Sequence, residues 1–239
     1  MRKTLDTTAQ SHFSLAAPPA LDKQNYKEHW RNSDNSNKYT LELGGGASLP
    51  AGSTKTYQDT GFNVRLGAGY QFNRRIAVLA QYDFNHFGVP KSISDELFFR
   101  PGSSPLSGAD LGASGAVHLW SLTLNPRVRY VHTEKVDAYV VAGGGFYRKL
   151  VRFNIPGECQ TLASCYFIDW PKIPLSHSSN NAGGFSAGTG IEWRVSYLPH
   201  GRYFVEGRYV WVDNSSTNTV YAPASYRTGY FPITAGLRW

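Results

Sequence analysis

Apolar and polar residues alternate with a period of two along most of the chain from Tyr39 onward. In the stretch YTLELGGGASL (39–49), Leu41 and Leu43 share one face, and Thr40 and Glu42 share the other. A period of two indicates a strand with one apolar face. Eight such segments are present, and we predict strands at 39–49, 62–72, 75–87, 117–131, 137–153, 184–196, 202–213 and 229–239. The fifth segment carries apolar residues on both faces, so its orientation is ambiguous.

The connections between these segments alternate in length. Short ones lie near 73–75, 132–136 and 197–201, and long ones, rich in Pro, Gly, Ser and Asn, lie near 50–61, 88–116, 154–183 and 214–228. Because an up-and-down sheet places alternate connections at opposite ends, the pattern predicts an all-β, eight-stranded antiparallel barrel over 39–239. Short periplasmic turns and long extracellular loops are typical of transmembrane barrels. Residues 1–38 are polar and show neither period, so we predict a periplasmic tail or linker.

The direction of the two faces separates a membrane barrel from a soluble one. A lipocalin-like barrel points its apolar set inward, whereas a membrane barrel points it at lipid. Here the polar faces are rich in glycine and mix arginines with acids, which favours a polar lumen. The predicted lumen network is Glu42, Arg65, Asp83, Arg127, Arg129, Glu192, Arg194, Glu206, Arg208 and Arg238. Aromatic residues near predicted strand ends fit an interfacial girdle: Tyr70, Phe72, Tyr130, Trp193, Tyr203 and Trp239.

The charge and composition of the chain narrow the classes of binding partner to be expected. The formal net charge is +7, but the basic residues are scattered rather than clustered, which argues against nucleic acid. Headgroup phosphates of outer-membrane lipid or lipopolysaccharide are an alternative partner for Lys91, Arg100, Lys149, Arg152, Lys172 and Arg227. No stretch is long and apolar enough for a transmembrane helix, and the first 20 residues contain no recognisable export signal.

The two cysteines, Cys159 and Cys165, are separated by five intervening residues in a polar segment. This spacing suits a local disulfide in an oxidising compartment. The seven histidines are dispersed without metal-ligand spacing, and the glycine clusters complete no phosphate-binding fingerprint, so we predict no metal and no cofactor.

The barrel pattern from about Tyr39 to Trp239 resembles the small outer-membrane β-barrel superfamily, the OmpA-type eight-stranded barrels of Gram-negative bacteria. The resemblance implies a location in the bacterial outer membrane. Its most specific part is the final amphipathic strand, in which Phe231, Ile233, Leu237 and Trp239 resemble the signal read by the barrel-assembly machinery. We expect this strand to close the barrel against the first one.

One stretch suggests an enzyme. SHSSNNAGG (176–184) is similar to the His-x-Ser-Asn-Ala-Gly stretch of lipid A deacylases. That similarity implies His177 as base, Ser179 as nucleophile and Glu192 as an orienting acid, an arrangement suited to ester hydrolysis. The stretch departs from the family pattern because Asn181 interrupts it and two more strands follow.

The sequence therefore predicts a non-enzymatic outer-membrane barrel with a structural or interaction role. An eight-stranded barrel is just wide enough for its own side chains, so a wide pore is not expected. The surface loops and the tail 1–38 are then the contact sites, the tail for a periplasmic partner. The alternatives are a lipid A deacylase-like hydrolase and a soluble, lipocalin-like ligand-binding barrel.

Overall fold

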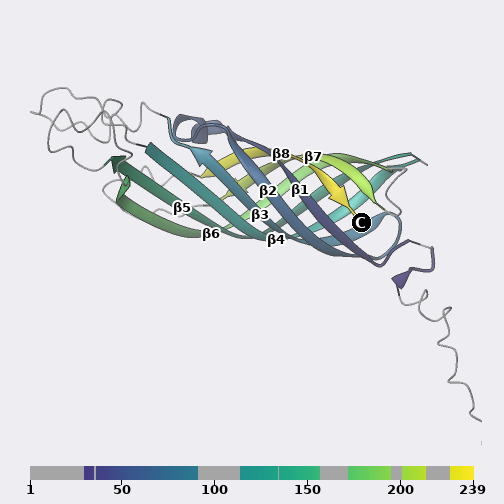
Figure 1. Ribbon diagram of the computed structural model, residues 1–239. Coiled ribbons are helices and arrows are strands. Elements are labelled where there is room, and N and C mark those ends of the chain that lie inside the picture. The colour runs from purple at the N-terminus through teal and green to yellow at the C-terminus, as the bar shows by residue number, and fades with distance from the viewer. Residues whose placement is uncertain are drawn as a thin grey trace, which may run out of the picture.

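The eight strands of the described residues form a closed antiparallel barrel (Figure 1). The computed structural model describes residues 30–34, 36–90, 114–133, 135–156, 172–194, 201–213 and 227–239. The strands are β1 (Tyr39–Ala51), β2 (Gly61–Gln71), β3 (Ile76–Gly88), β4 (Ser114–His132), β5 (Val136–Pro156), β6 (Lys172–Arg194), β7 (Arg202–Val212) and β8 (Thr228–Arg238). Each strand pairs with its neighbour in chain order, and β8 pairs with β1. The predicted eight-stranded barrel is confirmed, including its closure by the last strand.

One predicted boundary is wrong. β6 begins at Lys172 rather than near residue 184, and β5 runs on to Pro156, so part of the predicted loop 154–183 is a two-stranded ladder. His177 and Ser179 therefore lie on a strand, opposite Arg152 and Leu150. The sequence of 172–183 does not alternate between apolar and polar residues, and this part of the strand is defined by its backbone pairing with β5.

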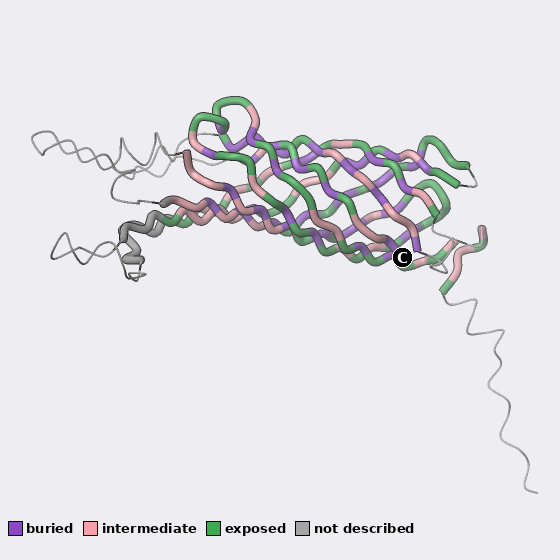
Figure 2. Tube along the Cα trace, turned by 45° about the horizontal axis from the view of Figure 1, so that its top comes forward, coloured by how far each residue is buried: buried purple, intermediate pink, exposed green. Residues whose placement is uncertain are grey.

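Side chains inside the barrel are polar and those outside are apolar. Along β1, Thr40 and Glu42 are buried, whereas Leu41 is 59% exposed and Leu43 48% exposed. Figure 2 shows this alternation of buried and exposed positions along strand after strand. The faces are opposite to those of a lipocalin-like barrel, so the soluble ligand-carrier alternative does not fit this structure.

The two ends of the barrel differ. The C-terminus and the tight β2–β3 and β4–β5 turns share one end, which we call the short-turn end. β5 and β6 rise past the other strands at the opposite end, the loop end (Figure 1). No helix within the described ranges is long and apolar enough to cross a bilayer.

Part of the predicted tail packs against the short-turn end. The amide of Gln71 donates to the carbonyl of Lys38, and the Asn32 side-chain amide donates to the carbonyl of Gln71 at 2.7 Å. The backbone N–H of Arg74 donates to Asp34 Oδ2 at 2.6 Å. Residues 30–38 are thus attached to the β2–β3 turn, while residues 1–29 lie outside the described ranges. Also outside them are Cys159, Cys165, Lys91 and Arg100, so the disulfide stays a prediction.

Candidate functional site

The lumen holds an extended network of ion pairs between the short-turn end and the middle of the barrel. We call it the ionic layer. Its members are Glu42, Arg65, Asp83, Arg127, Arg129, Asp137, Glu192, Arg202, Glu206, Arg208 and Arg238. They come from all eight strands, because the inward positions of every strand converge on one narrow interior.

Glu192 on β6 is the hub of this layer. Its carboxylate accepts from Arg129 Nε at 2.6 Å and from Arg238 Nη1 at 2.7 Å. Arg202 Nη1 lies at 3.2 Å and Arg127 Nη1 at 3.5 Å. Four arginines from β4, β7 and β8 therefore meet on one fully buried carboxylate.

Arg238 links the last strand, β8, to the first strand, β1. Its Nη2 and Nε donate to Glu42 Oε2 at 2.7 and 3.0 Å, and these residues are direct cross-strand partners on β8 and β1. Next to them, the backbone groups of Trp239 and Leu41 exchange hydrogen bonds of 2.9 and 3.0 Å. The seam is thus closed by a buried charge pair, in which one carboxylate oxygen accepts two guanidinium N–H groups, as well as by backbone pairing. Hydrogen bonds between charged groups are among the stronger polar contacts.

A second group of charges lies deeper in the lumen. Arg65 pairs with Asp83 at 2.5 Å and with Glu206, and Glu206 also pairs with Arg208. The Tyr139 hydroxyl donates to Glu206 Oε2 at 2.9 Å. Tyr139 fits here because Gly190 faces it. A Cβ at residue 190 would come within 2.5 Å of the tyrosine hydroxyl, so a side chain at Gly190 would displace the ring.

Nine of the ten residues of the predicted lumen network are buried on the inner wall. The exception is Arg194, which has the inward phase of β6 but is exposed at the end of that strand, where the barrel no longer encloses it. Sequence reasoning missed Asp137, Tyr139 and Arg202. Asp137 and Tyr139 lie in the segment that has apolar residues on both faces, so the alternation did not assign them to the lumen. What places them there is the strand pairing, in which Asp137 lies opposite Glu192 on the inner face.

Toward the loop end the lumen filling changes from charges to apolar and aromatic side chains. We call this group the aromatic plug: Phe87, Val117, Leu119, Tyr147, Val210, Val212 and Tyr230. The rings of Phe87 and Tyr230 meet edge to face with centroids 5.5 Å apart. The sequence pattern did not identify the plug, because an apolar residue on an inward position looks the same as one that faces lipid.

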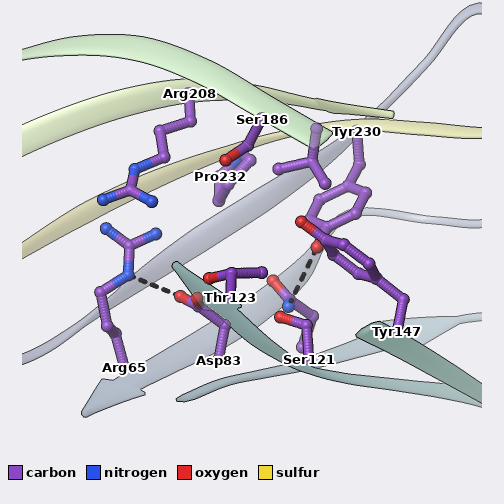
Figure 3. Close-up of a pocket in the computed structure, with 11 residues that line it drawn as sticks. Arg65, Asp83, Ser121, Thr123, Tyr147, Ser186, Arg208, Tyr230 and Pro232 are labelled. Carbon is purple, nitrogen blue, oxygen red and sulfur yellow. Dashed lines mark hydrogen bonds and ion pairs between the residues drawn. The ribbon is translucent and has the colours of Figure 1, made fainter. Parts of the chain in front are cut away.

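A small cavity of about 10 Å³ separates the two layers (Figure 3). Arg65, Asp83 and Arg208 line it on the ionic side and Tyr147 and Tyr230 on the plug side. This volume holds about one water molecule. Arg208 Nη2 is buried without a protein partner in the described ranges, and the cavity beside it has room for a water that would accept its hydrogen bond. Among the described residues, the side chains of the ionic layer and of the aromatic plug fill the lumen on either side of this cavity.

The proposed hydrolase residues do not come together. Ser179 is exposed and Glu192 is the buried hub, and both lie on β6. Thirteen positions at about 3.3 Å per residue separate them by roughly 40 Å, so Glu192 cannot orient a base beside Ser179. The His177 side chain lies outside the described part of the structure. Within the described ranges, no three His, Cys, Asp or Glu side chains gather as a metal site.

The outer wall carries an apolar belt between two groups of aromatic residues. At the short-turn end, Tyr39 contacts Tyr70 with ring centroids 5.7 Å apart, and Trp193 contacts Tyr203 at 6.1 Å. At the loop end, a second group consists of Tyr82, Phe84, Trp120 and Phe146. On β4, Trp120 and Tyr130 are ten positions apart, or about 25 Å in height on a tilted strand. This matches the apolar band of outer-membrane barrels.

Comparison with known proteins finds likeness in structure only. No protein-family model matches the sequence, and no curated protein resembles it closely enough to count as a relative. The chain is similar to Neisserial surface protein A, at 14% identity and a TM-score of 0.44, over 84% of this chain and 96% of that one.

Two further structures are similar over the same 84% of this chain. One is Ail, the attachment invasion locus protein of Yersinia pestis, at 16% identity and a TM-score of 0.42, covering 99% of that protein. The other is the outer membrane protease OmpT from Escherichia coli, at 10% identity and 0.37, covering 96%. The barrel itself is established by the strand pairing of this chain.

Proposed function

We propose that this protein is an integral barrel of the bacterial outer membrane that works through its surfaces, as a structural or interaction protein. The inverted wall supports this best. Large apolar side chains such as Leu124, 61% exposed, cover the outside, while Arg127 and Glu192 are sealed inside. A wall of this kind is unfavourable in water and suited to a bilayer.

The filled lumen favours a surface role over transport. The ionic layer occupies the short-turn half and the aromatic plug the loop half, with room for about one water between them. A passage for solutes requires both layers to move. The surfaces left for contacts with partners are then the loop end and the segment 30–38, which packs against the short-turn end. A periplasmic partner of residues 1–38 and recognition of β8 by the barrel-assembly machinery belong to the same proposal.

In the hydrolase alternative, Glu192 is not available as the orienting acid. With Glu192 committed to four arginines, His177 and Ser179 have no orienting carboxylate in the assignment that the similarity implied. A functional relay needs the base to be held by a third group. We therefore do not assign hydrolysis to this barrel.

The experiment is membrane fractionation combined with heat-modifiability. Expressed with an export signal in a Gram-negative host, the protein should enter the outer-membrane fraction and run at a different position on a denaturing gel when unboiled. The shift arises because a closed barrel, with β8 bonded to β1, resists detergent until it is heated. A soluble protein with no shift on boiling would contradict the proposal.

A further inference from the structure

The outward positions of β3 and β4 change in the same order toward the loop end, and two outward arginines of β5 lie beside them. On β4 the order is Leu122, Trp120, His118. The register aligns the other two strands with it, because Phe84 and His86 of β3 lie opposite Trp120 and His118, and Arg148 of β5 lies opposite Trp120. On β3 and β4, apolar, aromatic and histidine side chains therefore follow one another, while on β5 Arg148 lies at the level of Trp120 and Arg152 lies two positions beyond His118 toward the loop end.

The histidines and arginines on the outer face of these three strands lie close together. We call this group the outer cationic patch and define it as His86, His118, Arg148 and Arg152. The Nδ1 atoms of the two histidines are 3.4 Å apart, with ring centroids at 4.8 Å. His118 lies opposite Leu150 on β5, so Arg148 and Arg152 are its two diagonal neighbours on the same face. Diagonal positions in an antiparallel pair are within reach of long side chains.

Among the described residues, no carboxylate is paired with the two arginines of the patch. Arg148 Nε is buried and has no hydrogen-bond partner in the described ranges. Buried guanidinium groups are normally paired, because an unmet donor on a charged group is costly. An arginine with an unmet, buried donor beside a second arginine leaves a place for an acceptor that the described residues do not supply.

An apolar groove of about 480 Å³ lies on the same wall, nearer the middle of the belt. Its lining includes Leu41, Leu43, Leu66, Ala68, Ala80, Tyr82, Leu122 and Trp239. Ala68 and Ala80 are cross-strand partners, and their small side chains leave the space. The Tyr82–Leu122 pair is four positions from the His86–His118 pair on the β3–β4 ladder, about 13 Å. The groove thus approaches the patch from the apolar side.

We propose that the outer cationic patch and this groove together bind a phosphate-bearing lipid of the leaflet at the loop end. The phosphate lies between Arg148, Arg152 and the histidine pair, and an acyl chain occupies the groove over Ala68 and Ala80. The lipid-site proposal rests on the proposed location of the protein in the outer membrane. Arginine pairs well with phosphate oxygens, and the aromatic residues of β3 and β4 sit at the depth where headgroup and chain meet. A soluble polyanion gains nothing from the groove.

The test uses the full chain in detergent, with lipopolysaccharide as the probe and native mass spectrometry as the readout. Arg148→Gln and Arg152→Gln should each weaken binding about fivefold, the effect expected for one basic residue at an anionic membrane surface. Arg194→Gln is the matched control, because Arg194 is exposed at the opposite end of the barrel and should leave binding unchanged. Dephosphorylated lipopolysaccharide should bind wild type and both variants equally.

Two further measurements separate a lipid from a free anion. Ala80→Leu should fill the groove and weaken lipopolysaccharide binding while leaving all four basic residues in place. Inorganic phosphate should not displace the lipid from wild type. If it did, and Ala80→Leu bound normally, the site would be one for a free anion and the lipid proposal would be wrong. Equal binding by wild type and both arginine variants would also overturn it.

Failure of this proposal is distinguishable from failure of the proposed function. The arginine variants should keep outer-membrane fractionation and heat-modifiability, because Arg148 and Arg152 lie outside the lumen. If the variants fractionate normally but bind the lipid as wild type does, only the lipid-site proposal is contradicted. If wild type stays soluble, the lipid-site proposal and the proposed outer-membrane function are both contradicted.

Discussion

The two halves of the lumen are filled in different ways. The ionic layer holds its place through charge pairs between strands far apart in sequence, such as Arg238 with Glu42 and Glu192. The aromatic plug holds its place through packing, as between Phe87 and Tyr230. The charged half contains the cross-strand pair of Arg238 and Glu42, so it adds side-chain contacts to the seam between β8 and β1. Its members depend on one another, and we expect single substitutions to cost more there than in the plug.

Arg238→Ala tests this dependence and should give the largest effect. The change leaves Glu42 and Glu192 buried with fewer partners, and breaking a buried pair costs about 3–5 kcal/mol of the free energy of unfolding. Urea unfolding of the refolded barrel measures it. Arg194→Ala, an exposed arginine near the same end, should change stability by less than about 0.5 kcal/mol. Equal effects would show that the seam does not depend on its charges.

Leu119→Ala applies the same measurement to the plug. Leu119 is 1% exposed, so truncation leaves a cavity, and the expected loss is about 2–4 kcal/mol. Leu119→Met, which nearly conserves volume, should cost less than about 1.5 kcal/mol. A loss larger than that of Arg238→Ala would reverse the ranking of the two halves.

The sequence predicted the barrel and most of its inner wall for a simple reason. A period of two assigns faces directly, so Glu42, Arg65 and Glu206 could be placed in the lumen before any contact was known. Their partners could not be predicted, because pairing depends on register and on the stagger of the closed barrel. The plug was missed where inward positions are apolar, as at Val210 and Val212. The outer cationic patch was missed except for Arg152, because it forms only when three strands align.

Tyr139→Phe sharpens the comparison inside the ionic layer. The substitution removes the hydroxyl that donates to Glu206 but keeps the ring, so it tests a hydrogen bond without a change in packing. We expect a loss of about 1–2 kcal/mol in the same unfolding assay. Tyr130→Phe is the control, because Tyr130 is 61% exposed on the outer wall. If both substitutions had the same effect, the Tyr139 hydroxyl would contribute nothing to the layer.

The smallest expected effect lies outside the lumen, at the docked segment 30–38, and it depends on pH. Hydrogen bonding by Ser36, together with the backbone N–H of Arg74, holds the pKa of the Asp34 carboxyl below its ordinary value. A lowered carboxyl pKa means that the docking contribution is fully present above the ordinary aspartate pKa and is lost as pH falls through the lowered one. Because Asp34 is only partly buried, the effect is local and weakened by solvent. Hydrogen exchange at the Arg74 amide, compared between wild type and Asp34→Asn, measures it. Protection should be higher in wild type at neutral pH and converge with the variant in acid, whereas a constant difference would show that the Asp34 charge does not hold the segment.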